Sequence, residues 1–144
     1  MLQTIFTGQF FKLEKLRTES AFAKRHLEIA AFSVANSIPE GYADQIDGTI
    51  TELVPDWHWV KAYHQARNES ADVQARVLHR YEVAYKRYLM TLDCQLVYHR
   101  IIKAAKGRQP FLLCWERNDN PCHRHWIRDW FKYNGIPAME WNVR

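Results

Sequence analysis

The stretch FLLCWERNDNPCHRHWIRDWF, residues 111–131, carries the clearest structural pattern in the chain. Its continuous apolar run ends at Cys114 and predicts a buried strand of the kind found in parallel sheets. A polar loop follows, and from His123 onward the apolar residues recur at helical spacing until Gly135 ends the helix. The segment IPAMEWNV, residues 136–143, predicts a second strand, so that the whole region predicts a βαβ unit.

Outward from this unit, segments with strand and helix patterns alternate along the rest of the chain. The expected elements are strands at residues 2–7 and 27–34 and helices at residues 10–24, from Pro55 onward, and at 70–105. The last helix is expected to break near Asp93 and to end at Gly107. This alternation predicts one α/β domain over residues 1–144, with a mostly parallel sheet flanked by helices on both faces. The C-terminal βαβ unit would have a right-handed crossover and carry the Cys-His-Arg helix start.

Aromatic side chains account for 14% of the residues, and six of them are Trp. Tyr81, Tyr85 and Tyr88 recur at helical steps, and Trp126 and Trp130 lie four residues apart. This spacing predicts core positions, although an aromatic excess also suits stacking against bases or other flat ligands.

The overall composition is that of a folded globular chain. Hydrophobic residues make up 47% and charged residues 25% of the 144 positions, which excludes a disordered chain. The formal net charge of +4 permits a polyanionic partner without requiring one. No apolar run approaches the roughly 20 residues of a membrane span, and the first residues lack a secretory leader pattern. With only three Cys, we expect a cytoplasmic protein with free thiols and no membrane partner.

Chemically active side chains gather at the centre of the opening stretch, where Cys122, His123 and Arg124 arrive at the start of the helix. In a parallel sheet this helix start lies at the carboxyl edge of the strands, and its N–H groups attract anions. There Cys122 is expected to have a lowered pKa and to act as a nucleophile, with His123 as proton carrier. Arg124 is expected to clamp an anion, and Glu116 to orient Arg124 or act as a base. Cys114 is a second candidate nucleophile.

The same residues allow two plainer interpretations. Cys114 ends an apolar strand and suits a buried structural position. Cys114, Cys122 and His123 are also soft metal ligands, with His99 or His125 as a fourth. Their spacing differs from the paired C-x2-C pattern of zinc sites, and two adjacent residues at a helix start are poorly placed to chelate one ion. We therefore expect neither a metal nor a cofactor.

The stretch LLCWERNDNPCHRHWIRDWF, residues 112–131, resembles the Domain of Unknown Function 488 family, small α/β proteins of bacteria, archaea and their phages. That family's pattern has a strand ending Leu-Leu-Cys, a Glu two residues later, and Cys-His-Arg opening a helix. The tail GIPAMEW with Glu140, and FSVANSIP at residues 32–39, are also similar to the family. Many members carry an Arg after the second strand, where this chain has Ser33 and Asn36. These two are the candidate anion-binding residues at that position, and the resemblance implies the fold and the location of a site.

These observations favour an enzyme with a Cys/His/Arg anion-binding site that acts on a nucleotide, a nucleic acid or another phosphate-bearing substrate. A non-catalytic module that binds a nucleotide or nucleic acid at the same site is the alternative, and a small zinc protein is a third possibility. The expected partner is thus an anionic small molecule or a nucleic acid. The sequence does not predict the oligomeric state.

Overall fold

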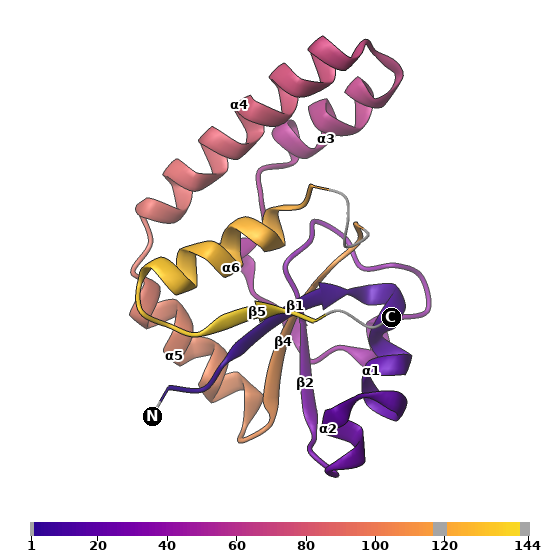
Figure 1. Ribbon diagram of the computed structural model, residues 1–144, viewed down its shortest axis with the longest axis vertical. Helices are drawn as coiled ribbons and strands as arrows, with labels where there is room; N and C mark the ends of the chain where they lie inside the picture. Colours follow the sequence, from indigo (N-terminus) through magenta and orange to yellow (C-terminus); the bar gives the residue numbers. More distant parts are fainter. Residues whose placement is uncertain (1, 117–120, 142–144) are drawn as a thin grey trace.

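The structure is a computed structural model that describes residues 2–116 and 121–141 (Figure 1). In this part of the chain, five strands form one sheet in the order β3-β2-β4-β1-β5, and all neighbours in it are parallel. The strands are β1 (Ile5–Gln9), β2 (Ile29–Ser33), β3 (Gly48–Thr49), β4 (Gln109–Cys114) and β5 (Ala138–Glu140). The predicted α/β class with a parallel sheet is confirmed.

Helices make the connections between these strands. They are α1 (Leu13–Glu19) and α2 (Ala21–Lys24) before β2, α3 (Trp57–Gln65), α4 (Ala71–Met90) and α5 (Cys94–Ala105) before β4, and α6 (His123–Tyr133) before β5. Short 3-10 turns lie at Phe10–Lys12, Ala43–Gln45, Thr51–Leu53 and Ala66–Asn68. None of the described helices is long and apolar enough to cross a membrane.

The two faces of the sheet are covered by different helices, as predicted. Figure 1 shows α1 and α2 on one side of the strands and α5 and α6 on the other. On the first face the Phe22 ring of α2 packs edge-on against Phe6 and Phe111, with ring centroids 5.2 Å and 5.5 Å away. On the second face α6 packs against β1, β4 and β5. The C-terminal βαβ unit thus straddles β1, the first strand of the chain.

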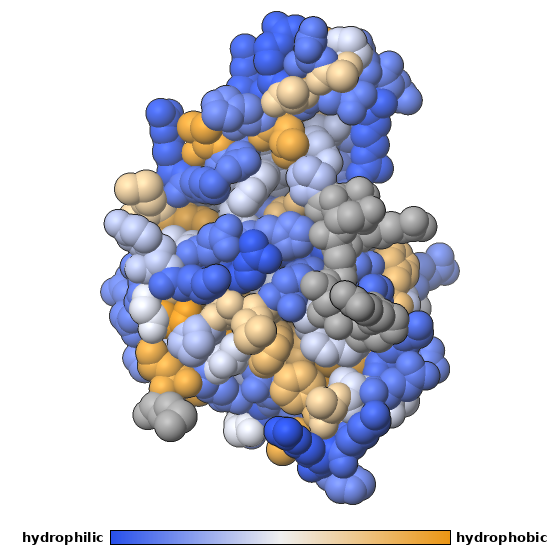
Figure 2. All heavy atoms as spheres, in the orientation of Figure 1, coloured by the Kyte–Doolittle hydropathy of each residue, from blue (hydrophilic) through white to orange (hydrophobic). Residues whose placement is uncertain are grey.

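Helices α3 and α4 form a hairpin, residues 57–90, that stands away from the sheet and reaches it through α6 (Figure 1). Hydrophilic side chains cover the outer part of this hairpin (Figure 2). Its inner side contributes aromatic residues to the core, because Tyr81 and Tyr85 are buried and the Tyr81 ring packs edge-on to Trp126 of α6 at 5.0 Å. The predicted core positions of Tyr81, Tyr85, Trp126 and Trp130 are confirmed, whereas Tyr88 is 39% exposed.

Side-chain caps fix where the long helices begin. The Ser70 Oγ accepts a hydrogen bond from the Val73 N–H at 3.3 Å, and the Asp93 carboxylate accepts one from the Leu96 N–H at 3.1 Å. Because Asp93 has an extended backbone, the helical pattern of residues 70–105 is divided into α4 and α5, which confirms the break. Gly107 follows the last turn of α5 with φ of 83°, a conformation that glycine adopts without strain.

The bounds of several predicted elements differ from the structure. The first strand begins at Ile5 rather than Leu2, and the helix of residues 10–24 is interrupted at Ser20, whose extended backbone ends α1 and caps α2. The two-residue strand β3 was not predicted, because neither periodicity nor an apolar run marks so short an edge strand. The last strand ends at Glu140, while positions 142 and 143 of its predicted range lie outside the described residues.

Candidate functional site

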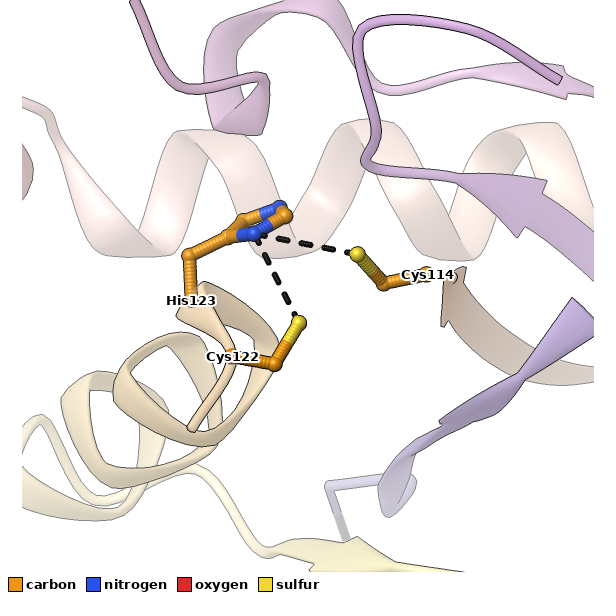
Figure 3. Close-up of side chains that lie close together, drawn as sticks. All are labelled: Cys114, Cys122 and His123. Atoms are coloured by element: carbon orange, nitrogen blue, oxygen red, sulfur yellow. Dashed lines mark hydrogen bonds between the residues drawn. The ribbon is translucent and has the colours of Figure 1, made fainter. Parts of the chain in front are cut away.

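Three soft side chains meet at the carboxyl edge of the sheet, where β4 ends and α6 begins (Figure 3). Cys114 is the last residue of β4, Cys122 is the N-cap of α6, and His123 is the first residue of that helix. Their two sulfur atoms and one ring nitrogen lie within 4.8 Å of one another. All three side chains are buried, with at most 5% of each residue exposed. We call this group the Cys-Cys-His cluster.

The backbone at the start of α6 explains why two adjacent residues reach a common centre. Cys122 has an extended conformation, with φ of −150° and ψ of 144°, and its side chain makes no capping hydrogen bond. His123 is already helical, so the chain turns between the two residues. Figure 3 shows the Cys122 and His123 side chains converging on each other and on Cys114. The change of conformation within the pair therefore brings both side chains to the end of β4.

The imidazole of His123 is held by a backbone carbonyl on its far side. Its Nε2 lies 2.6 Å from the Val34 carbonyl oxygen, and because a carbonyl only accepts, Nε2 is the protonated donor. In the neutral ring Nδ1 is then an acceptor, and it faces the Cys114 Sγ at 3.8 Å and the Cys122 Sγ at 3.7 Å. The ring also packs edge-on against Tyr85 at 5.5 Å. These contacts fix both the orientation and the tautomer of His123.

The two cluster cysteines differ in their thiol chemistry. A hydrogen bond from the Cys122 thiol lowers the pKa of Cys114, and the charge of Arg124 and the backbone N–H groups of Glu116 and Trp115 lower it further, against the effect of burial. Burial raises the pKa of Cys122, and its bond to Cys114 raises it further. The pair therefore favours a thiolate on Cys114 and a thiol on Cys122, opposite to the expectation that Cys122 would have the lowered pKa.

Arg124 is the second residue of α6 and is fully buried in an ion pair. Its Nε lies 3.1 Å from both carboxylate oxygens of Glu140, and its Nη2 lies 3.0 Å from one of them. Its Nη1 donates to the Glu116 carbonyl oxygen at 2.6 Å. Hydrogen bonds from His125, Arg124 and Thr7 lower the pKa of Glu140 to about 2, although burial alone would raise it. Arg124 therefore links the β4–α6 connection to β5 and does not line the cavity described below.

Glu116 follows β4 by two residues and turns its side chain toward the α3–α4 hairpin. Its Oε1 accepts a hydrogen bond from Arg67 Nη2 at 2.7 Å and lies 3.7 Å from His64 Nε2. The carboxylate is thus paired with Arg67, while the Glu116 backbone carbonyl binds Arg124. Glu116 therefore contacts the hairpin through its side chain and α6 through its backbone carbonyl.

A cavity of about 640 Å³ opens beside the Cys-Cys-His cluster, whose three residues contribute to its wall. This volume is typical of pockets for small molecules. Asn36 and Glu116 also line the cavity, so the structure brings five of the seven predicted site residues to it. Ser33 does not line it, because this side chain is fully buried and its Oγ accepts the Ala35 N–H at 3.1 Å. Ser33 stabilises the turn after β2.

The rest of the cavity wall comes mostly from residues that the sequence did not indicate. Trp57, Tyr63, His64 and Arg67 contribute to it from the α3–α4 hairpin, and Trp115 does so from the end of β4. Among the described residues of the cavity wall, Arg67 is the one with a permanently charged basic side chain. The aromatic residues after Pro55 were a visible signal, but the sequence does not say which face of α3 turns toward the βαβ unit.

Together the fold and the site define a class of protein, a small parallel α/β domain with a cysteine and histidine cluster at the carboxyl edge of its sheet. The family model for the active DUF488-N3 subclade, DUF488-N3a, matches residues 16–135. The chain belongs to this family, which confirms the resemblance to the Domain of Unknown Function 488 proteins. No curated protein and no solved structure matches the chain.

Proposed function

We propose that this protein is a thiol-dependent enzyme that acts on a nucleotide or another anionic substrate bound in the cavity beside the Cys-Cys-His cluster. The observation that carries the proposal is the convergence of two thiols and one oriented imidazole on the wall of a ligand-sized cavity. The family description, which calls the subclade active, agrees with catalysis.

In this proposal Cys114 is the nucleophile. Its sulfur faces His123 Nδ1, an acceptor that is free to take the thiol proton because Nε2 donates to Val34. Cys122 donates its thiol hydrogen to the Cys114 sulfur, and this hydrogen bond stabilises the Cys114 thiolate. Attack by Cys114 forms a bond from sulfur to the electrophilic atom of the substrate and breaks the bond to the leaving group. The proton held by His123 then goes to that leaving group.

The cavity wall supports a substrate that has a flat ring and a negative charge. Trp57, Tyr63 and Trp115 offer aromatic surface, and Trp57 and Trp115 are 55% and 39% exposed. Arg67 and His64 lie at the same wall and suit a phosphate or carboxylate. We therefore assign anion binding to Arg67 and Asn36, and give Arg124 the role of holding the β4–α6 connection in place.

The proposal is tested by the reactivity of each cysteine and by turnover. Iodoacetamide labelling of the folded protein, mapped by mass spectrometry, should modify Cys114 faster than Cys94, because burial raises the pKa of Cys94 to about 11. Cys114→Ser should abolish turnover of any nucleotide that the parent converts, and Cys94→Ser should leave turnover unchanged. Full turnover by Cys114→Ser, or labelling of Cys114 no faster than that of Cys94, would contradict the assignment.

A non-catalytic binding module is the second candidate, because Cys114 and Cys122 are only 5% and 4% exposed and a ligand in the cavity has limited access to them. A binding module should hold nucleoside monophosphates equally well in the parent and in Cys114→Ser, with neither converting them. Calorimetry combined with product analysis separates the two functions.

A further inference from the structure

We propose that the Cys114 and Cys122 sulfurs and the His123 Nδ1 form a binding site for one thiophilic divalent cation, with Zn²⁺ as its representative, and that the bound cation blocks the thiol chemistry. The first part stands on geometry alone. The second part rests on the proposed function.

The distances within the cluster agree with those around a tetrahedral zinc ion. Bonds of about 2.3 Å to sulfur and about 2.0 Å to nitrogen place a sulfur and a nitrogen ligand about 3.5 Å apart. The two sulfur–nitrogen distances are 3.8 Å for Cys114 and 3.7 Å for Cys122, and all three ligand atoms lie within 4.8 Å of one another. The two sulfur–nitrogen separations would therefore change by only a few tenths of an ångström on binding, and the two sulfurs, now within 4.8 Å, would settle about 3.8 Å apart.

His123 already has the orientation and the tautomer that a metal ligand requires. A ligating imidazole commonly donates its other N–H to a carbonyl or carboxylate, which orients the ring and leaves the ligating nitrogen unprotonated. His123 makes this contact through Nε2, 2.6 Å from the Val34 carbonyl oxygen, and directs Nδ1 at both sulfurs. The imidazole would bind a cation without rotating and without losing a proton.

One of the two reasons for expecting no metal does not hold in the structure. Adjacent residues at a helix start were expected to be poorly placed to chelate one ion, but the extended backbone of Cys122 and the helical backbone of His123 make their side chains converge. The third ligand, Cys114, comes from β4, a strand paired on both sides by β1 and β2. The ligands thus come from two elements that the sheet and α6 hold in place.

The fourth position of such an ion would be supplied from the cavity, which Cys114, Cys122 and His123 all line. Three protein ligands with one open position distinguish exchangeable and catalytic zinc sites from closed structural ones. The charges also agree, because two thiolates balance a divalent cation and the neighbouring Arg124 is matched by Glu140. The buried group would carry no uncompensated charge.

A bound cation and a reactive thiol exclude each other at this site. Binding releases the thiol protons and places a lone pair of each sulfur on the metal. Cys114 could then neither attack a substrate nor transfer a proton to His123. The metal-loaded protein is therefore the inactive form, and removal of the metal restores the thiol.

Metal binding is measured on the full chain, reduced and freed of metal, by titration with Zn²⁺ against a chromogenic chelator and with Co²⁺ by absorption spectroscopy. We expect one equivalent of either ion, with thiolate-to-cobalt charge transfer and the intense visible bands of tetrahedral cobalt. Cys114→Ser, Cys122→Ser and His123→Ala should each weaken binding at least about 100-fold. Cys94→Ser and His99→Ala, which change residues outside the cluster, should leave it unchanged. Circular dichroism of each variant verifies that it folds.

Labelling with iodoacetamide then separates this proposal from the proposed function. Zn²⁺ should slow labelling of Cys114 and Cys122 about tenfold or more and leave Cys94 unaffected. If the three cluster variants bind Zn²⁺ as tightly as the parent, the metal site is wrong, whatever the reactivity of Cys114. If Zn²⁺ binds through the cluster but metal-free Cys114 reacts no faster than Cys94, the metal site stands and the thiol enzyme is wrong.

Discussion

The βαβ unit from β4 to β5 and the α3–α4 hairpin contribute to the same cavity in different ways. The βαβ unit provides the Cys-Cys-His cluster from buried residues, and within this unit the Arg124–Glu140 pair links the start of α6 to β5. The hairpin provides Trp57, His64 and Arg67, all of them at least partly exposed and joined to the unit by Glu116. The βαβ unit therefore positions the buried cluster, while the hairpin supplies an exposed part of the cavity wall.

The largest effect that would distinguish the two regions is expected at Arg124. Arg124→Met leaves the carboxylate of Glu140 buried without its main partner, which should lower the free energy of unfolding by about 3–5 kcal/mol. Arg128→Met is the matched control, because the Arg128–Asp129 pair is on the surface, and should cost at most about 1 kcal/mol. Urea unfolding measures both. Equal losses would mean that the βαβ unit does not depend on its buried ion pair.

Acid should weaken the βαβ unit through the same pair. The pKa of Glu140 is lowered from its ordinary value of 4.5 to about 2, so its ionised form stabilises the fold above pH 4.5, and this contribution is lost as the pH falls from there to about 2. The loss amounts to about 3 kcal/mol. Urea unfolding between pH 6 and pH 2.5 measures it, and Glu140→Gln should show a flatter pH dependence. An equally steep loss in Glu140→Gln would assign the acid sensitivity to other carboxylates.

A smaller effect is expected where the hairpin is anchored. The Tyr85 hydroxyl is buried and donates to the Leu53 carbonyl oxygen at 2.7 Å, so Tyr85→Phe should cost about 1–2 kcal/mol. The exposed Tyr88 hydroxyl donates to the Glu52 carbonyl oxygen at 2.6 Å, and Tyr88→Phe should cost less than about 0.5 kcal/mol, because water can replace it. If the order is reversed, the hairpin is held by its outer contacts rather than by its buried tyrosines.

The smallest effect on stability, and a clear effect on binding, is expected at the hairpin side of the cavity. Arg67→Gln removes an ion pair whose Arg side chain is 51% exposed, so the free energy of unfolding should change by less than about 1 kcal/mol. Binding of nucleoside monophosphates should weaken about tenfold, as loss of one charged hydrogen bond implies. Calorimetry on Arg67→Gln and on Arg76→Gln, an exposed arginine of α4 outside the cavity, gives the comparison. Equal affinities would remove Arg67 from the site.

The βαβ unit was predictable from the sequence because its signals are local. An apolar run ending at Cys114, helical periodicity from His123 and the closing Gly135 define strand, helix and turn within one continuous stretch. The gathering of Cys114 with Cys122 follows from this unit, since the end of a strand and the start of the next helix lie at the same edge of a sheet.

The environment of the site was not predictable, because it depends on contacts between distant segments. The sequence does not indicate that Arg124 would form an ion pair with Glu140, or that Arg67 would form one with Glu116. An arginine beside a helix start has the same local signature whether it binds a ligand or a carboxylate of a later strand. The direction of the thiol pKa shifts likewise depends on which sulfur donates to the other, which only the folded geometry determines.

The position of β1 between β4 and β5 has a consequence for synthesis on the ribosome. Phe6 of β1 is aligned with Phe111 of β4 and with Met139 of β5, so both partners of this early strand are made late. β1 has no neighbour until β4 has emerged through Cys114, and Arg124 lacks the carboxylate that anchors the start of α6 until Glu140 has emerged. The Cys-Cys-His cluster therefore assembles only after β4, α6 and β5 have all emerged, although β1 is made first.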